Sequence, residues 1–274
     1  MRFGRSLSST MMLADEFARH PEIEAVVLSG SFSVDLADEL SDFDLYIYSR
    51  KPIEVEFRDA LLRPRATQLN LHRTFWEDED AWIESSGEKF EAMYRSCNWA
   101  EGEIASRLER FEACVGYTTA VLYNVANSEV LFDRHGWFNT IQSRVNLPFP
   151  RPLIQAIIDK NFPLLADVLS SYEEQIATAI RRRDVVSINH RFAAWLASYF
   201  DILFAANERF HPGEKHLLTH VGRLPDLPVN VVRDVTETCA DIATISTALS
   251  NRLADMRRRL ASWLGQKAFP VSHG

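Results

Sequence analysis

Cysteine is scarce in this sequence of 274 residues, with Cys97, Cys114 and Cys239 as its three copies. They are far apart and form no C-x-x-C pair, which argues against a disulfide framework and against a cysteine zinc site. Long apolar runs are missing too: no stretch of about 18 apolar residues predicts a membrane-spanning helix. The N-terminus also lacks the apolar segment of a secretory signal. We therefore expect a cytoplasmic protein with no membrane partner.

Positive charge is in deficit, because 30 Lys and Arg residues face 38 Asp and Glu residues and give a formal net charge of −8. A surface that follows a nucleic-acid backbone needs a cation at each phosphate contact, so a long nucleic acid is not an expected partner. A small anionic ligand carried by metal ions remains compatible with this balance. The hydrophobic content of 46% and charged content of 25% exclude disordered, collagen-like and coiled-coil classes.

The first hundred or so residues alternate between strand and helix patterns. The expected elements are a helix at 9–20, strands at 24–28 and 44–48, a helix at 53–62, and strands at 68–75 and 89–94. This alternation predicts a small unit built around a mixed sheet. The acidic run 77–80 in between has the composition of a solvated helix start rather than of a metal site.

Beyond residue 98 the periodicity becomes helical. We expect helices at 98–111, 152–159, 163–182, 187–209 and 233–264, separated by breaks that contain proline or glycine. The fold class is therefore α+β, with an N-terminal mixed-sheet domain at 1–146 followed by a C-terminal helical bundle at 147–274. The pattern leaves open whether segment 116–132 belongs to the sheet or to the bundle.

The most informative stretch begins with Gly30-Ser31, which ends an apolar strand, and continues ten residues later with Asp42-Phe43-Asp44. Carboxylates at alternate positions of a strand project from the same face, so Asp42 and Asp44 can share a divalent cation. A Gly-Ser turn exposes backbone N–H groups and a hydroxyl, and glycine permits a phosphate to approach the backbone closely. Together these residues predict a place that holds a metal-bound triphosphate.

This order of strand, Gly-Ser, short insertion, Asp-x-Asp and strand resembles the signature of nucleotidyltransferases of the DNA polymerase beta superfamily. The chain is most similar to the small bacterial members that modify aminoglycoside and lincosamide antibiotics, and its second half resembles a helical domain found attached to such enzymes. The resemblance implies a third carboxylate on a later strand, where Glu91 fits. If the strand around Asn70 were the matching one, that amide would take the place of the acid and could not act as a base.

The resemblance implies transfer of a nucleoside monophosphate from a nucleoside triphosphate, such as ATP, to a hydroxyl of a small polar acceptor, with two Mg²⁺ ions as cofactors. Asp42, Asp44 and Glu91 would be the catalytic residues and metal ligands, and Gly30, Ser31 and Lys215 the nucleotide contacts. The protein would be a monomer or homodimer. Two alternatives stay open: nucleotidylation of a tRNA or a protein, and a non-catalytic nucleotide-binding or antitoxin-like protein of the same fold.

Overall fold

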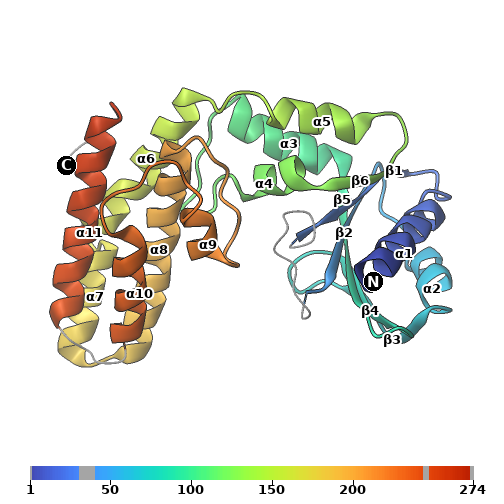
Figure 1. The fold of residues 1–274 in the computed structure, drawn as a ribbon, viewed down its shortest axis with the longest axis horizontal. Helices are drawn as coiled ribbons and strands as arrows, with labels where there is room; N and C mark the ends of the chain where they lie inside the picture. Colours follow the sequence, from blue (N-terminus) through green and yellow to red (C-terminus); the bar gives the residue numbers. More distant parts are fainter. Residues whose placement is uncertain (1, 31–40, 243–246, 272–274) are drawn as a thin grey trace. The chain divides into compact units, whose positions relative to one another are not determined.

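The computed structural model of the chain describes residues 2–30, 41–242 and 247–271 (Figure 1). Ser31 therefore lies outside the described residues. The chain forms two compact units: one contains 1–105 and 124–147, and the other contains 106–123 and 148–274. The chain passes into the second unit for the last time between residues 147 and 148, one residue from the division expected from the sequence. Segment 106–123, which the sequence division places in the first domain, packs with the helical unit instead.

The first unit is built around a mixed six-stranded sheet, which confirms the predicted α+β fold class. Its strands are β1 (Ile23–Ser29), β2 (Phe43–Ser49), β3 (Ala66–Arg73), β4 (Glu79–Glu84), β5 (Lys89–Ser96) and β6 (Glu129–Asp133). Their spatial order is β3-β4-β5-β2-β1-β6, with β3 and β6 at the edges. β2 and β5 run parallel and the other pairs are antiparallel. Strand β4 was not expected from the sequence.

The two faces of this sheet differ because side chains alternate along each strand. Phe43, Leu45 and Ile47 of β2 share one buried core with Leu13 and Phe17 of the first helix. We call this the covered face. Each such side chain contributes about 1.5–3 kcal/mol of hydrophobic stabilisation when fully buried. The opposite face, which we call the site face, carries the even-numbered side chains of β2.

Five helices accompany the sheet, and two of them continue into the second unit. They are α1 (Arg2–Phe17), α2 (Val55–Leu62), α3 (Cys97–Leu108), α4 (Ala120–Asn127) and α5 (Trp137–Val145). Helix α5 packs on the site face at one end, where Trp137 and Phe138 contact the ring of Tyr48 at centroid distances of 5.4 Å. The end of that face nearer to Asp44 is less covered, since Asp44 and Tyr46 are only partly buried.

The second unit is helical. Its helices are α6 (Arg151–Ala166), α7 (Tyr172–Arg182), α8 (Val185–Ala206), α9 (Leu217–Val221), α10 (Val231–Asp241) and α11 (Thr247–Gln266). Two expectations were wrong here. Pro163 does not separate two helices but lies inside α6, and the pattern at 233–264 belongs to two helices rather than one. None of the helices in the described ranges is long and apolar enough to cross a membrane.

A buried polar network ties segment 106–123 to the helical unit. Asp201 of α8 is 1% exposed and accepts hydrogen bonds from the backbone N–H and the hydroxyl of Thr118, at 3.0 and 2.7 Å. Asn161 of α6 donates to Asp201 at 3.3 Å and accepts from the N–H of Gly116 at 2.9 Å. Burial raises the pKa of Asp201 to about 7, although these hydrogen bonds and Arg107 oppose the rise. The network thus fixes the segment to two helices.

Candidate active site

Strand pairing places two of the predicted site carboxylates side by side. Asp44 of β2 is the register partner of Glu91 on the parallel neighbour β5 and of Ser29 on β1. Register partners in a sheet project from the same face. Asp42 precedes β2 by one residue and lies two positions from Asp44. Asp44 and Glu91 are therefore neighbours at one end of the site face, beside the end of β1, and Asp42 lies just before that end of β2.

Gly30 is packed against the carboxylate of Asp44. Its φ of +70° lies in the left-handed region, which favours glycine. A Cβ atom at this position would stand 1.9 Å from Oδ2 of Asp44, far inside contact distance. Glycine is thus required here both by the backbone and by the space that Asp44 occupies.

The other two acids are held by loose ion pairs. Oδ1 of Asp42 lies 3.9 Å from Nζ of Lys89, and Oε1 of Glu91 lies 3.8 Å from Nη1 of Arg73. The carboxylates of Asp42 and Glu91 are 38% and 35% exposed, so water and solutes reach both. In this arrangement no three His, Cys, Asp or Glu side chains of the described chain form a ready-made metal cluster.

The alternative position for the third carboxylate, Asn70, is distant from the aspartates in the sheet. Asn70 lies on edge strand β3, and its register partner is Ala81 of β4, which in turn pairs with Glu91. Two strands therefore separate Asn70 from Asp44, whereas Glu91 is on the adjacent strand. Of the two candidates, Glu91 alone is a neighbour of Asp44.

The structure gives no contact between the carboxylates and the two remaining predicted nucleotide contacts, Ser31 and Lys215. Ser31 falls outside the described residues. Lys215 is an exposed residue just before α9 in the second unit, whereas Gly30, Asp42, Asp44 and Glu91 belong to the first. Its contact with a nucleotide stays a prediction.

Aromatic and polar residues that the sequence did not single out line the site face next to Asp44. The ring of Tyr46 lies beneath the guanidinium of Arg95 at 4.1 Å, and Asn124 donates to the Tyr46 hydroxyl at 3.3 Å. Ser29 in turn donates to Asn124 at 3.4 Å. Burial raises the pKa of Tyr46 to about 12, with Arg95 opposing and Asp44 adding to the rise. Tyr46 therefore stays a neutral phenol. The period-two spacing from Asp44 was the signal that could have placed it on this face.

The acidic run 77–80 is not a solvated helix start, which corrects the expectation from the sequence. Its side chains alternate between the two faces of the sheet, and each is paired with an arginine. On the site face, Glu77 makes two hydrogen bonds of 2.7 Å with Arg95, and Glu79 lies 2.7 Å from Arg73. This alternation is the period of a strand, and β4 begins at Glu79.

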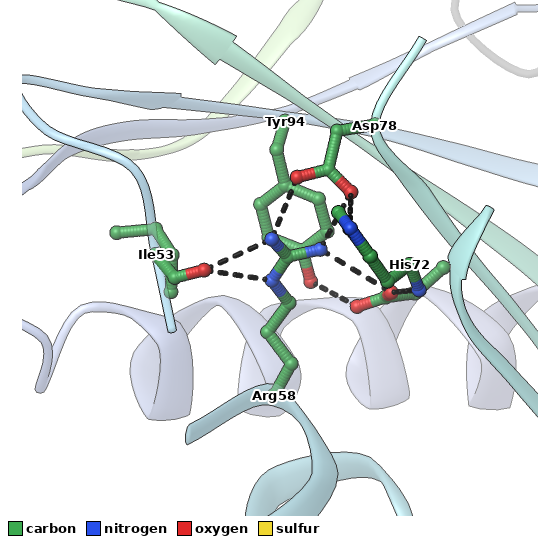
Figure 2. A network of polar contacts seen from close by, with 6 residues as sticks. Ile53, Arg58, His72, Asp78 and Tyr94 are labelled. Atoms are coloured by element: carbon green, nitrogen blue, oxygen red, sulfur yellow. Dashed lines mark hydrogen bonds and ion pairs between the residues drawn. The ribbon is translucent and has the colours of Figure 1, made fainter. Parts of the chain in front are cut away.

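On the covered face, Asp78 and Asp80 converge on Arg58 of α2 (Figure 2). Arg58 is 2% exposed; its Nη2 lies 2.7 Å from Asp78 and its Nη1 lies 3.4 Å from Asp80. Tyr94 donates to Asp80 at 2.7 Å, and its ring lies 4.0 Å from the guanidinium carbon. The backbone N–H of His72 also donates to Asp80, at 2.8 Å.

Burial shifts the two aspartates of this network differently. Burial raises the pKa of Asp80, and its hydrogen bonds and the charge of Arg58 offset this only in part. Burial also acts to raise the pKa of Asp78, but hydrogen bonds from Arg58 and His72 outweigh it and the net shift is downward. Asp78 is therefore the firmly ionised partner of Arg58. The network fixes the 74–78 loop between β3 and β4 to the covered face.

The chain was compared with family models, curated proteins and solved structures. A family model described as "Domain of unknown function (DUF4037)" matches residues 115–217, a range that includes Gly116, Thr118, Asn161 and Asp201. A search of curated proteins finds no match.

Two solved structures are similar in outline. A nucleotidyltransferase-like protein from Exiguobacterium sibiricum 255-15 aligns with a TM-score of 0.43 and 11% identity, covering 95% of this chain and 74% of that chain. The apo form of a CCA-adding enzyme aligns with a TM-score of 0.30 and 12% identity, covering 93% of this chain and 78% of that chain. Neither is described as an antibiotic-modifying enzyme, so that part of the resemblance stays a prediction.

Proposed function

We propose that this protein transfers a nucleoside monophosphate from a nucleoside triphosphate to a hydroxyl group of a small polar acceptor and releases pyrophosphate. The observation that carries the proposal is the meeting of Gly30, Asp44 and Glu91 on three elements of one sheet face. Three separate sequence signals, far apart in the chain, converge there. A purely structural role for these residues would not explain why the Asp44 carboxylate packs on Gly30 at the end of a strand.

The donor set suits Mg²⁺. Carboxylate oxygens are the ligands that this hard cation takes from proteins, together with substrate phosphates. Asp42, Asp44 and Glu91 would hold the ions, and the carboxylates of Asp42 and Glu91, about one third exposed, would each exchange a loose cation partner for them. When bound, Mg²⁺ supplies electrostatic stabilisation of the oxygens that gain charge during phosphoryl transfer.

The chain's own residues would position and deprotonate the reactants. The backbone at Gly30 would hold the phosphates of the nucleotide, since a glycine lets an anion approach the peptide N–H groups. Glu91 would take the proton of the acceptor hydroxyl as that oxygen attacks the α-phosphorus. Gly30 has a second role, because the absence of a Cβ atom leaves room for the Asp44 carboxylate at the strand end.

A second candidate function is non-catalytic nucleotide binding. It is favoured by the ion pairs of Arg73 with Glu91 and of Lys89 with Asp42, which neutralise two of the three acids without any metal. Transfer to a tRNA or a protein is a further alternative, and net charge −8 argues against the tRNA.

One experiment separates these functions. The purified protein is incubated with Mg²⁺ and ATP, CTP, GTP or UTP labelled at the α-phosphate, together with pools of small hydroxyl compounds, and pyrophosphate release and labelled product are measured. We expect label transfer from at least one nucleotide and none with Asp44→Asn or Glu91→Gln. Calorimetric titration with Mg²⁺ and a non-hydrolysable triphosphate covers the second candidate: binding without turnover in any pool would favour it. Unchanged turnover of Asp44→Asn would refute the catalytic assignment.

A further inference from the structure

Strand β3 is the last strand at one edge of the sheet (Figure 1). Among the described residues, no strand pairs with its outer edge. An open cavity of about 610 Å³ borders this strand and is lined by Leu69, Asn70, Leu71, Arg73, Phe75 and Trp76. The N–H and C=O groups along such an edge are a template for pairing with a further strand.

The cavity is bordered by side chains from both faces of the sheet. Leu69 and Leu71 pack against the core of the covered face. Asn70, between them, is the register partner of Ala81 and therefore belongs to the site face. A space that both faces border lies at the rim of the sheet. The occupant that fits it is an extended chain, because the side chains of a strand also alternate between two faces.

The two ends of β3 carry groups that complement each other. Just beyond one end, Phe75 and Trp76 are 80% and 84% exposed, with their rings edge to face at 6.3 Å. Just before the other end, Pro64 is exposed and the side chain of Arg63 is 66% exposed. Guanidinium groups bind favourably to the faces of aromatic rings. Within one chain the eight residues of β3 separate these ends, so their contact needs a second copy of the chain.

An antiparallel pair of β3 strands about a twofold axis brings the complementary ends together. If the axis passes at Asn70, residues equally far before and after Asn70 face each other across the pair. Leu69 of each copy then faces the partner's Leu71, which makes two apolar cross-strand pairs. The other opposed residues are Gln68 and His72, Thr67 and Arg73, Arg65 and Phe75, Pro64 and Trp76, and Arg63 and Glu77. In this register no two like charges between residues 63 and 77 are opposed.

The adjacent registers are less favourable. An axis at Leu69 would place Arg65 opposite Arg73, and like charges directly opposite each other destabilise a strand pair. An axis at Leu71 would place Leu69 opposite Arg73 and lose both leucine pairs. The sequence of the strand therefore selects Asn70 as the position on the axis.

The regular part of the edge is short. The register of β3 with β4 shifts between Asn70 and Arg73, and His72 has a φ of +52°. The N–H of His72 donates to Asp80 of the same chain at 2.8 Å and is not offered to a partner. Such a bulge interrupts a ladder. The aromatic and basic groups at the two ends therefore supply a large share of the binding.

We propose that β3 is a homodimer interface. Two copies pair their β3 strands antiparallel about a twofold axis at Asn70 and join their six-stranded sheets, and Phe75 and Trp76 of each copy pack on segment 63–65 of the other. Arg73 keeps its ion pair with Glu79 in this arrangement. The dimer is independent of nucleotidyl transfer, since the candidate metal ligands lie on other strands.

Position 70 provides a test that is specific for this register, because a residue on the axis faces its own copy. Asn70→Asp and Asn70→Lys each place two like charges on the axis, whereas an equimolar mixture of the two variants places opposite charges there. Sedimentation equilibrium of the full-length proteins over the micromolar range measures dimerisation, and circular dichroism checks that each variant is folded. The matched control is Gln68→Asp, on the same face of the same strand, which faces His72 instead of itself.

We expect dimers of the wild type and of Gln68→Asp. Each Asn70 variant alone should raise the dissociation constant about tenfold or more, and the mixture should restore the dimer. Trp76→Ser should raise the constant about fivefold to thirtyfold, which corresponds to two symmetrical exposed cation–π contacts.

A monomeric wild type would overturn the proposal and leave the edge of β3 to a different protein. A dimer that both Asn70 variants retain, an equal loss with Gln68→Asp, or a mixture that stays monomeric would refute the pairing about Asn70. An unchanged constant for Trp76→Ser would refute the packing of the aromatic end on the partner.

Discussion

The two faces of the sheet use the same chemical groups in different ways. On the covered face, Arg58 is 2% exposed and lies 3.4 Å from the fully buried Asp80 and 2.7 Å from Asp78, whose side chain is 31% exposed. On the site face, Glu91 and Asp42 are about one third exposed and stand 3.8 and 3.9 Å from their cations. Both faces pair carboxylates with arginine or lysine. The site face also holds Glu77 and Glu79 at 2.7 Å from arginines, so the exchangeable carboxylates are those of Asp42 and Glu91.

This difference follows from what packs on each face. Arg58 of α2 and Asp80 of β4 are buried on the covered face, where the ring of Tyr94 lies beside the Arg58 guanidinium (Figure 2). Breaking such a pair from one side leaves a buried charge without compensation. The exposed pairs of the site face are screened by water and contribute little to folding. The carboxylates of Asp42 and Glu91 are therefore available for a ligand at low energetic cost.

The largest effect on stability is expected from Arg58→Met. We expect it to lower the free energy of unfolding by about 3–5 kcal/mol, because Asp78 and Asp80 lose their buried cation. Urea denaturation followed by circular dichroism measures the change. Arg63→Met, which removes an exposed pair with Asp59 on the same helix end, serves as the control and should leave the curve nearly unchanged. Equal effects of the two substitutions would mean that burial does not set the difference between the faces.

Gly30→Ala tests the site face without changing a charge. The new Cβ would displace the Asp44 carboxylate, and a misplacement of this size costs about a hundredfold in turnover. The matched control is Gly136→Ala, at the same φ of +70° but with nothing within 4 Å of the added atom. Both variants carry the same backbone strain, so a turnover loss shared by both would show that strain, and not Asp44, is responsible.

Asp201 is a buried carboxylate that accepts hydrogen bonds from the neutral groups of Thr118 and Asn161, so it differs from the arginine-paired Asp78 and Asp80. Its pKa of about 7 exceeds the ordinary 3.8, so between about pH 4 and pH 7 the folded protein binds more protons than the unfolded chain. The free energy of unfolding should fall by a few kcal/mol as pH rises through this window and level off above it. Asp201→Asn should remove that slope, whereas Asp159→Asn on the surface of α6 should retain it. Denaturation midpoints at a series of pH values measure both.

The smallest effect is expected from Lys89→Met. Its pair with Asp42 is 3.9 Å long and exposed, so unfolding should change by less than about 1 kcal/mol. Removing the competing cation should at the same time tighten Mg²⁺ binding in the presence of a non-hydrolysable triphosphate, as measured by calorimetry. Weaker Mg²⁺ binding in this variant would assign Lys89 to the phosphates instead of to Asp42.

Local patterns predicted the parts of the fold that local physics determines. Strands β1 and β2 have apolar runs beside turn residues, and the spacing of Asp42 and Asp44 placed both on one face before any pairing was known. Strand β4 was missed because its first residues, Glu79 and Asp80, are acidic, and their partners Arg73 and Arg58 come from other elements. An acidic strand becomes favourable through contacts that no short window of sequence contains.

Two features of the helical unit depend on contacts between distant residues. Pro163 is compatible with α6 because the surrounding apolar residues are buried against other helices, which compensates for the hydrogen bond that proline cannot make. The sequence pattern left open to which unit segment 116–132 belongs, because Thr118 and Gly116 find their partners in Asp201 and Asn161, 83 and 45 residues further on. Only the folded arrangement reveals to which unit the segment belongs.

The path of the chain through segment 106–123 has a practical consequence for dissecting the protein. A fragment cut at the sequence boundary, 147–274, would retain Asp201 and Asn161 and lose the backbone N–H of Gly116 and the backbone and hydroxyl donors of Thr118. Asp201 of α8 would then keep the hydrogen bond from Asn161 and lose both donors of Thr118. A helical unit expressed by itself therefore needs residues 106–123 supplied, either by a rearranged chain order or as a separate peptide that complements it.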